Sequence, residues 1–365
     1  MHLFAAGSNA QGQLATGDDK DAHEFTPCKF LVAGKEVVEV PGSVIKVVAG
    51  ANHSIALLED PVTLERSLWG AGDGSKGQLG PRIRHSTGPY RVYHSLNISL
   101  PNENCSPEDV CAAWETSFVR VHDGTTGRDY IFSFGSNDQG LLGVASGITP
   151  LDVNIVNFTL TGYEETEVAF FTAGPRTAYA IVKDLRVAPA KKVLVGWGAS
   201  KHGQLAITSG DLDAPQVKYS VSTMVPQAIE LPRDEHVEHV AGGFQHAVIL
   251  TSSGRLLGLG SNKKRQLGIS TSVGSEEGRR LSIGATWNSS FVLDESRQTF
   301  FACGSNDHGQ LGGVLDSQLL AMVSLLEGFV VDLWVCGSEH VLVLARSVQF
   351  PHRNILYGIW YDTSY

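Results

Sequence analysis

The sequence predicts an all-β fold in which a repeated four-stranded unit is arranged around an axis. A glycine-rich phrase recurs six times along the 365 residues, and a second phrase lies between its copies. Short apolar runs separated by turns, such as Thr251–Gly254, lead from each second phrase into the next glycine-rich phrase. One sheet cannot bury both of its faces alone, so we expect neighbouring sheets to pack face to face.

The clearest copy of the glycine-rich phrase is Gly-Ser-Asn-Asp-His-Gly-Gln-Leu-Gly at 304–312. The six copies share two glycines, except that Arg265 replaces the second glycine of the fifth copy. These repeat glycines are Gly7, Gly12, Gly72, Gly77, Gly135, Gly140, Gly198, Gly203, Gly260, Gly304 and Gly309. Such loops use glycine where φ is positive, so a bulky residue at Gly135 or Gly304 is expected to cost several kcal/mol.

The spacing of the second glycine sets the size of the repeated unit. Successive intervals are 65, 63, 63, 62 and 44 residues, which is too long for a helical hairpin or a leucine-rich repeat. A four-stranded unit with loops fits this length. We therefore expect one domain over residues 1–365. Its approximate repeat starts are at 2, 67, 130, 193, 255 and 299, and a terminal strand is expected at 354–360.

The second phrase reads Ala-Gly-Ala-Asn-His-Ser at 49–54. The histidine position of this phrase holds His53, His246 and His340. When the units are aligned with one another, the same position holds Thr116, Thr177 and Trp287 in the other units. A metal site or a catalytic role would need the histidine in every unit that performs it. The variation instead favours a role in packing the loop, by a hydrogen bond or by bulk.

Composition and charge exclude several classes of function. The chain has 38 acidic and 28 basic side chains, a net charge of −10 and a pI near 5.7. Nucleic-acid binding through phosphate neutralisation needs clustered Lys and Arg, so direct DNA binding is not expected. No apolar run approaches about 18 residues, and the first residues lack a charged leader, which predicts neither a membrane span nor a signal peptide. We expect a cytoplasmic protein, with the nucleus as a second compartment.

The reactive residues do not form a recognisable centre. The five cysteines are odd in number and none has CxxC spacing, so neither a structural zinc site nor a disulfide framework is predicted. Cys303 and Cys336 lie in apolar strands and are expected to be buried. No Ser-His-Asp or Cys-His arrangement has the local sequence of a known nucleophile. The sequence therefore predicts a protein that is not an enzyme, without a cofactor or metal.

Two basic stretches are candidate contacts for a partner. The first is the predicted long loop at 81–109, and the second is a triplet that we expect at a loop tip. Their candidate residues are Arg82, Arg84, Tyr90, Arg91, Tyr93, Lys263, Lys264 and Arg265. Both could bind an acidic partner or, in the first case, RNA, but solvated loops are the favoured interpretation.

Six tryptophans mostly occupy repeat positions. They are Trp69, Trp114, Trp197, Trp287, Trp334 and Trp360. Large aromatic side chains at repeated positions are typical of core packing. We therefore expect core residues in preference to a surface cluster that absorbs light.

The two alternating phrases resemble the repeat of the regulator of chromosome condensation family. The resemblance covers about residues 2–360, with six units matching in order. It implies that family's seven-bladed β-propeller, one form of the ring expected above. Because a seventh second phrase does not follow Trp360, we expect six complete blades and a seventh that is incomplete at the C-terminus.

The resemblance also implies a function. Within the family, the sequence is most similar to the group of short propellers that includes the fungal alpha-tubulin suppressor. That group implies a protein-binding scaffold that pairs with a small zinc protein of diphthamide synthesis and supports Elongator in modifying wobble uridines of tRNA. The alternatives are nucleotide exchange on a Ran-like GTPase and an adaptor in a ubiquitin or cytoskeletal pathway. No membrane partner is implied.

Overall fold

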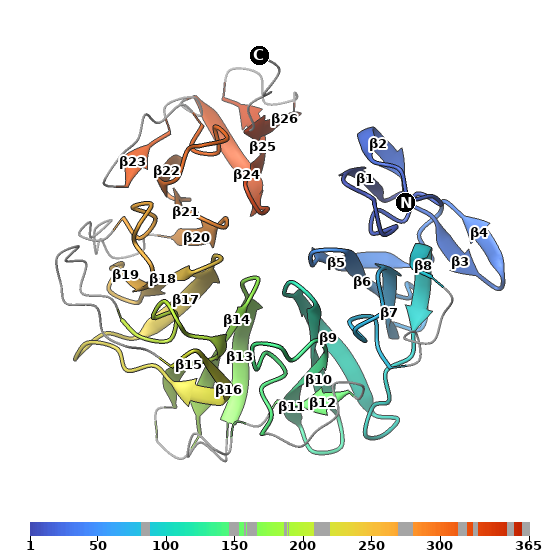
Figure 1. Ribbon diagram of the computed structural model, residues 1–365, viewed down its shortest axis with the longest axis horizontal. Coiled ribbons are helices and arrows are strands. Elements are labelled where there is room, and N and C mark those ends of the chain that lie inside the picture. The colour runs from blue at the N-terminus through green and yellow to red at the C-terminus, as the bar shows by residue number, and fades with distance from the viewer. Residues whose placement is uncertain are drawn as a thin grey trace.

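A computed structural model shows an all-β chain whose sheets are arranged in a ring (Figure 1). The structure describes residues 1–81, 88–145, 153–156, 158, 166–185, 188, 190–207, 220–268, 280–312, 320–323, 328–348 and 354–359. Every regular element within these ranges is a β-strand. Correspondingly, no helix in these ranges is long and apolar enough to cross a membrane.

The strands form successive sheets in chain order, and all neighbours pair antiparallel except β3 and β8, which pair in parallel (Figure 1). The first ring sheet contains β5 (Ser43–Ala49), β6 (His53–Glu59), β7 (Arg66–Gly72) and β8 (Tyr90–Leu96), extended by β3 (Phe30–Val32) and β4 (Lys35–Val37). The second contains β9 (Cys105–Ala112), β10 (Thr116–Asp123), β11 (Arg128–Gly135) and β12 (Asn154–Ile155). The third contains β13 (Thr166–Ala173), β14 (Thr177–Asp184), β15 (Lys191–Ala199) and β16 (Ser222–Ala228).

Three further sheets continue the ring. The fourth contains β17 (Val237–Gly242), β18 (His246–Thr251) and β19 (Leu256–Gly260). The fifth contains β20 (Leu281–Ala285), β21 (Ser289–Asp294), β22 (Thr299–Gly304) and β23 (Ala321–Met322). The sixth contains β24 (Phe329–Cys336), β25 (Val341–Ser347) and β26 (Asn354–Ile359). In each sheet the first strand lies at the edge nearest the centre of the ring (Figure 1).

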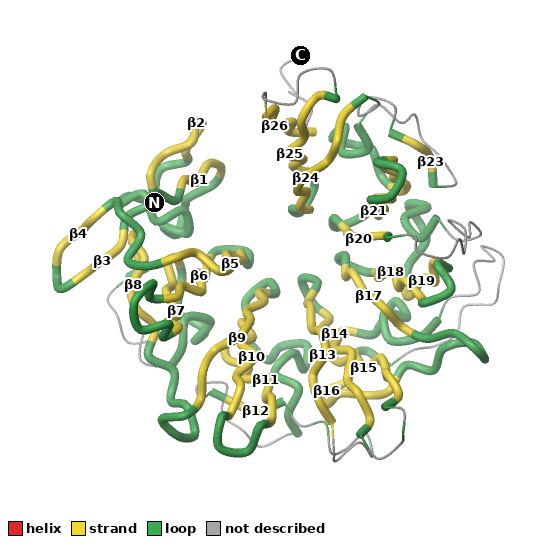
Figure 2. Tube along the Cα trace, turned by 180° about the vertical axis from the view of Figure 1, so that it is seen from behind, coloured by secondary structure: helices red, strands yellow, loops and turns green. Residues whose placement is uncertain are grey.

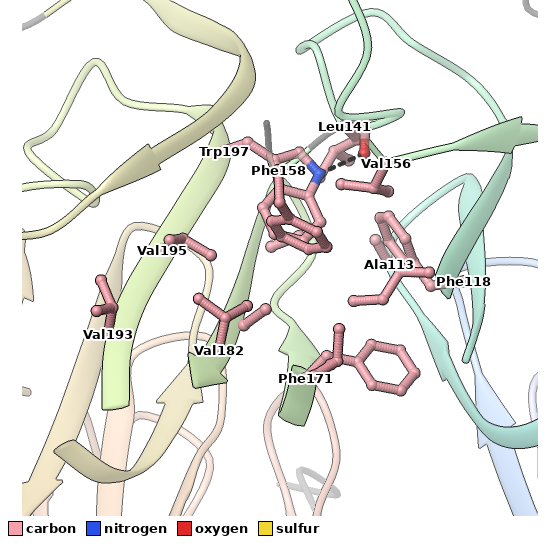
Figure 3. Packing of buried hydrophobic residues seen from close by; sticks show 14 residues of the cluster. Ala113, Phe118, Leu141, Val156, Phe158, Phe171, Val182, Val193, Val195 and Trp197 are labelled. Carbon is pink, nitrogen blue, oxygen red and sulfur yellow. Dashed lines mark hydrogen bonds between the residues drawn. The ribbon is translucent and has the colours of Figure 1, made fainter. Parts of the chain in front are cut away.

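The hydrophobic core lies between the sheets, as the sequence predicts. Between the second and third sheets, side chains of β10 and β11 interdigitate with side chains of β14 and β15 (Figure 3). Phe118 and Trp197 meet edge to face there, with ring centroids 6.0 Å apart. Further clusters bridge the first and second, the third and fourth, and the fifth and sixth sheets. The second strands, such as β18 and β21, are buried along their whole length because a sheet packs on each of their faces.

The incomplete part of the ring differs from the expectation. The predicted terminal strand is β26, and it pairs along its length with β25 as the third strand of the sixth sheet. It does not begin a separate sheet. A two-stranded sheet is formed instead by β1 (Phe4–Gly7) and β2 (Ala22–Pro27) at the N-terminal end. Seen from behind, these two sheets stand on either side of the opening in the ring (Figure 2).

Two predicted loops contain strands. The sequence of 15–36 is polar and predicts a loop, but this segment includes β2 and β3. The segment 81–109 includes β8, which pairs with β7 on one side and with β3 on the other. The prediction was wrong for β8 because charged and polar residues interrupt its apolar alternation. Only Val92, Tyr93 and Leu96 of that strand are fully buried. The sequence of 313–327 is compatible with either a short helix or a strand. This stretch lies outside the described residues apart from Leu320–Val323.

Candidate protein-binding face

The recurring Asn and Gln of the glycine-rich phrase build one loop by local hydrogen bonds. The amide Oδ1 of Asn306 accepts from the backbone N–H of Leu311 at 2.9 Å, and the Oε1 of Gln310 accepts from the N–H of His308 at 2.9 Å. The Asn bond recurs at Asn9, Asn137 and Asn262. The Gln bond recurs at Gln13, Gln78, Gln204 and Gln266. The exposed side chains directly after the Asn, such as those at 307 and 308, accept none of these bonds and are free to differ.

In every phrase except the first, the first glycine packs against the turn that joins the first two strands of its sheet. At Gly135 and Gly304, φ is +116° and +111°, which confirms the positive φ expected there. A Cβ on Gly304 would lie 2.4 Å from the carbonyl oxygen of Asn288 in that turn. The next residue, Ser305, donates its N–H to the same oxygen at 2.9 Å. The glycine-rich loops and these turns therefore form one continuous face of the ring.

The turns of neighbouring sheets are also bonded to one another. The N–H of Ala51 donates to the carbonyl of Trp114, and the N–H of Trp114 donates to the carbonyl of Pro175. On the other side, Phe244 donates to Trp287 and Trp287 donates to Ser338. Pro175 has no N–H and cannot continue the series to the next turn. The face is therefore a framework of backbone bonds that carries variable side chains.

The repeat histidines take part in this packing. His53 and His246 are buried, and the Nε2 of His53 lies 2.9 Å from the hydroxyl of Ser117 in the next sheet. That hydroxyl donates to the carbonyl of Gln78, so the imidazole is the donor and its Nδ1 has no partner among the described residues. His246 bonds Ser290 in the same way at 3.0 Å. His340 is exposed and rests on Gly337.

Burial makes these histidines sensitive to acid. Desolvation lowers the pKa of His53 to about 4, although the Asp73 carboxylate acts in the opposite direction. Desolvation also lowers the pKa of His246 to about 4. An unfolded histidine takes up a proton near its ordinary value of about 6.5. Between about 4 and 6.5 the unfolded chain thus binds more protons than the folded chain, and the fold loses stability as the pH falls through that window.

The variant His53→Thr introduces the residue found at position 116. We expect its free energy of unfolding to fall less steeply with decreasing pH in this window. Protonation of one such histidine in the unfolded chain lowers the free energy of unfolding by about 3 kcal/mol by the time the pH reaches about 4. This figure follows from about 1.4 kcal/mol per unit of difference between the folded and unfolded pKa. Unfolding by urea, measured across the window, gives the slope of stability against pH. The exposed His23 provides the control as His23→Thr. Equal acid slopes in all three proteins would contradict the assignment.

The strand register corrects the alignment of the fifth second phrase. Ser289 pairs with Gly304 as His246 pairs with Gly260, so Ser289 occupies the histidine position. Trp287 therefore corresponds to Trp114 and Phe244, two residues before that position. An alignment moved by two residues, Thr-Trp-Asn-Ser at 286–289, would have shown this from the sequence.

Trp114, Phe244 and Trp287 meet on this face, and we call them the axial aromatic cluster. The ring centroids of Trp114 and Trp287 are 5.4 Å apart, and those of Phe244 and Trp287 are 5.7 Å apart. They come from turns of the second, fourth and fifth sheets, which converge at the centre of the ring. All three side chains are partly exposed. The expectation of core tryptophans holds for Trp69 and Trp197 and is wrong for Trp114 and Trp287, because these lie on turns.

Cations surround one side of the axial aromatic cluster. The guanidinium carbon of Arg176 lies 4.9 Å from the centroid of the Phe244 ring. Lys201 and Lys263 belong to the adjacent glycine-rich loops, and burial together with their charges lowers the pKa of His202. We call Arg176, Lys201 and Lys263 the cationic sector. All three are exposed, and no carboxylate of the described chain lies within ion-pair distance of them.

The basic triplet lies on this face, as expected for a loop tip. Lys263 belongs to the cationic sector, whereas Lys264 pairs with Asp307 of the next loop at 3.1 Å. Arg265 has φ of +63°, the conformation that glycine provides at Gly77 and Gly309. Its backbone therefore follows the standard loop despite the missing glycine.

The candidates of the 81–94 segment do not form a single patch. Tyr93 is 3% exposed and stacks on Phe30, so it is a core residue and no partner can reach it. Arg91 pairs with Asp19 at 2.7 Å, and Tyr90 stacks on His94. Their strand, β8, lies between β7 and β3, three strands away from β5 at the inner edge of its sheet, whereas the aromatic cluster lies at the centre. Arg82 and Arg84 lie outside the described residues.

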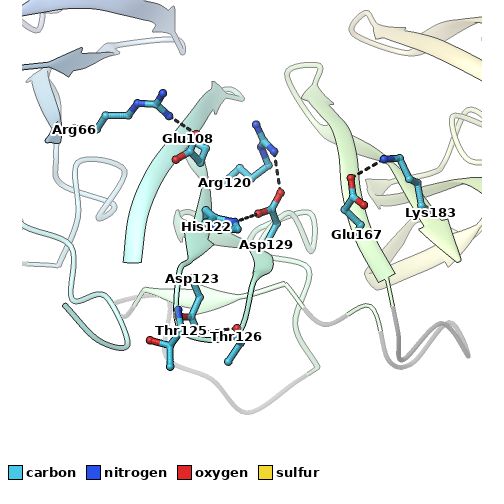
Figure 4. A network of polar contacts seen from close by, with 10 residues as sticks. All are labelled: Arg66, Glu108, Arg120, His122, Asp123, Thr125, Thr126, Asp129, Glu167 and Lys183. Atoms are coloured by element: carbon cyan, nitrogen blue, oxygen red, sulfur yellow. Dashed lines mark hydrogen bonds and ion pairs between the residues drawn. The ribbon is translucent and has the colours of Figure 1, made fainter. Parts of the chain in front are cut away.

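A charged groove lies at the opposite end of the strands. In the second and third sheets it is lined by Glu108, Arg120, His122, Asp129 and Glu167, with a volume near 550 Å³. Asp129 accepts from Arg120 and from His122 at 2.8 Å each, and Arg66 of the first sheet reaches Glu108 (Figure 4). No serine, threonine or cysteine is among the groove's lining residues. These ion pairs join strands and neighbouring sheets at the rim.

The described part of the chain holds no group of three or more metal-ligating side chains. All five cysteines are free thiols, and Cys303 is buried as expected, whereas Cys336 is partly exposed. Burial raises the pKa of the Cys303 thiol to about 12, which keeps it protonated and unreactive.

This geometry defines a β-propeller that presents a loop-built binding face. A model of the regulator of chromosome condensation (RCC1) repeat matches residues 2–57 and 194–250, and a second model of the same repeat matches 237–266. The chain accordingly contains RCC1 repeats at these residues. The wider family resemblance expected from the two phrases is thereby confirmed.

Several curated proteins are similar to this chain. The human probable E3 ubiquitin-protein ligase HERC6 is 25% identical over 86% of the chain, and the ultraviolet-B receptor UVR8 of Arabidopsis thaliana is also 25% identical over 86%. The secretion-regulating guanine nucleotide exchange factor of Bos taurus is 28% identical over 73%. The chain spans 29%, 62% and 49% of the lengths of these three relatives, respectively.

Solved structures support the fold. Human WBSCR16 superimposes with a TM-score of 0.67 and 17% identity, covering 94% of this chain and 86% of that one. Prp20p of Saccharomyces cerevisiae gives a TM-score of 0.54 and 13% identity, covering 99% of this chain and 92% of that one. The propeller fold is thereby confirmed. The number of blades, the narrower similarity to the alpha-tubulin suppressor group and the cellular location remain predictions.

Proposed function

We propose that this protein is a protein-binding scaffold that acts through the face of glycine-rich loops and turns. One observation carries the proposal: the framework bonds of this face repeat from sheet to sheet, while the exposed side chains between them differ. Such a surface is rigid and offers variable contacts, which is how loops on a scaffold usually serve recognition.

For the partner, we propose a small zinc protein of diphthamide synthesis and, through it, Elongator. The support is the sequence resemblance to the short propellers of the alpha-tubulin suppressor group. Calorimetry with the purified zinc protein at near-physiological salt tests this pairing. A one-to-one complex is expected. A folded sample, verified by circular dichroism, that gives no heat of binding would rule this partner out.

Nucleotide exchange on a Ran-like GTPase is the second candidate. It is favoured by the name of the bovine relative and by the fold shared with Prp20p, whose structure is described together with its binding to Gsp1p and histones. The assay is release of a fluorescent GDP analogue from the GTPase. Acceleration of release would favour exchange over the scaffold role alone. An adaptor role in ubiquitin or cytoskeletal pathways is the third candidate, supported by the names of the HERC relatives.

A further inference from the structure

We propose that the axial aromatic cluster and the cationic sector together form a docking site for an acidic protein segment that carries one aromatic side chain. The inference rests on the proposed scaffold function and deepens it, because it names the surface and the chemistry of the partner. It uses turns that come from four consecutive sheets of the ring.

The aromatic part of the site is preformed. Trp114, Phe244 and Trp287 lie within 6.3 Å of one another between ring centroids, and each remains partly exposed. Their backbones are fixed by the bonds between turns, since Phe244 donates to Trp287 at 3.0 Å and Trp114 donates to Pro175 at 3.0 Å. Partly exposed tryptophans on a rigid frame are typical anchors of protein interfaces. An added aromatic ring would pack against them edge to face or offset.

The cationic part of the site lies directly beside it. Arg176 covers the Phe244 ring, and its carbonyl accepts from Ala199, which places its turn against the loop of Lys201. The carbonyl of Gln245, next to Phe244, accepts from Ser261 at the start of the loop of Lys263. Arg176 thus borders the Phe244 ring, while Lys201 and Lys263 lie in the loops bonded to the neighbouring turns. None of the three has a carboxylate partner among the described residues.

Charge complementarity decides the class of partner. The three cations of the cationic sector, which have no carboxylate partner in the described part of the chain, favour an anionic segment. The chain as a whole carries a net charge of −10, so the remaining surface repels anionic polymers at long range. A short acidic peptide gains the local pairs and carries few charges elsewhere. Single-stranded RNA also offers stacking bases and negative charge, but it needs an extended basic groove along its backbone.

The test uses synthetic peptides and the intact chain. The probe is a short peptide of Asp and Glu residues with a single central Phe, and matched peptides replace that Phe with Ser or every acid with its amide. Tryptophan fluorescence and calorimetry report binding. The protein variants are Arg176→Glu and Lys263→Glu together, and Trp287→Ser. Lys35→Glu on the exposed β4 provides a control for a charge change elsewhere.

We expect the acidic Phe peptide to quench or shift tryptophan emission and to bind with a micromolar dissociation constant. The double charge variant and Trp287→Ser should each weaken binding by at least about tenfold, and Lys35→Glu by less than about twofold. Raising the salt concentration should weaken binding to the wild-type protein more than to the double variant.

Four outcomes would overturn the proposal, and the last of them would leave the scaffold role intact. The first is equal affinity for the acidic Phe peptide and its Ser or amide versions. The second is tighter binding of a uridine oligonucleotide than of the peptide, which would assign the site to RNA. The third is self-association of the chain, abolished by the same substitutions, which would assign the face to a second copy. If the zinc protein or a GTPase binds unchanged to the double variant, the scaffold role survives and this surface is wrong.

Discussion

Replacing Gly304 with alanine is expected to reduce the free energy of unfolding by about 3 to 5 kcal/mol. The residue has φ of +111°, which an L-amino acid adopts only with strain. The added Cβ would also lie 2.4 Å from the oxygen of Asn288 and 2.7 Å from the Cα of Ser289. Both atoms belong to the backbone and cannot rotate away, so the turn or the loop must move. Urea unfolding followed by circular dichroism measures the loss.

Gly7 is the matched control because it occupies the same place in the first phrase. Its φ is +114°, but a Cβ there would meet nothing within 4 Å, since no turn packs against the sheet of β1 and β2. Gly7→Ala therefore carries the conformational strain without the steric clash and should cost only about 1 to 2 kcal/mol. Equal losses at both positions would show that the close approach of the turn contributes nothing.

The variant Trp197→Ala is expected to reduce the free energy of unfolding by about 3 to 5 kcal/mol, because it leaves a cavity and removes buried apolar surface. Trp197 is 1% exposed and contacts Phe118 and Phe158 between the second and third sheets (Figure 3). Its indole N–H donates to the carbonyl of Leu141 at 2.8 Å. Removing the indole leaves that buried carbonyl without its donor, which adds to the loss.

Trp287→Ala separates core packing from surface packing. The residue type and the change are the same, but Trp287 lies on a turn and is partly exposed. We expect a loss below about 2 kcal/mol, since solvent already covers part of the ring. Thermal and urea midpoints of both variants give the comparison. A Trp287→Ala loss as large as that of Trp197→Ala would place the aromatic cluster in the core and remove it as a docking surface.

The candidate site was only partly predictable. The loop tip with Lys263 and Lys264 follows from the repeat, because the bonds that build the loop are accepted by Asn262 and Gln266 and not by these two side chains. Arg176 and Phe244 carried no signal, since each occurs once at its position and looks like ordinary variation. Trp114 and Trp287 were assigned to the core because a strand and a turn cannot be distinguished by residue type alone. Tyr93 was assigned to a surface loop because charges interrupt the alternation of β8.

The sequence alone determined the all-β repeat and the positions where glycine is required. It did so because each phrase is a local structure: Asn306 and Gln310 bond amides within five residues, and Gly304 owes its φ to its own turn. Only the tertiary structure decided which turns meet. The strand before each glycine-rich phrase pairs with the strand that precedes it in the chain. The corresponding strand β26 therefore completes the sixth sheet, and β1 pairs with β2 in a separate two-stranded sheet. The contact of Trp114 with Trp287 depends on the curvature of the whole ring, and a local sequence pattern cannot predict that curvature.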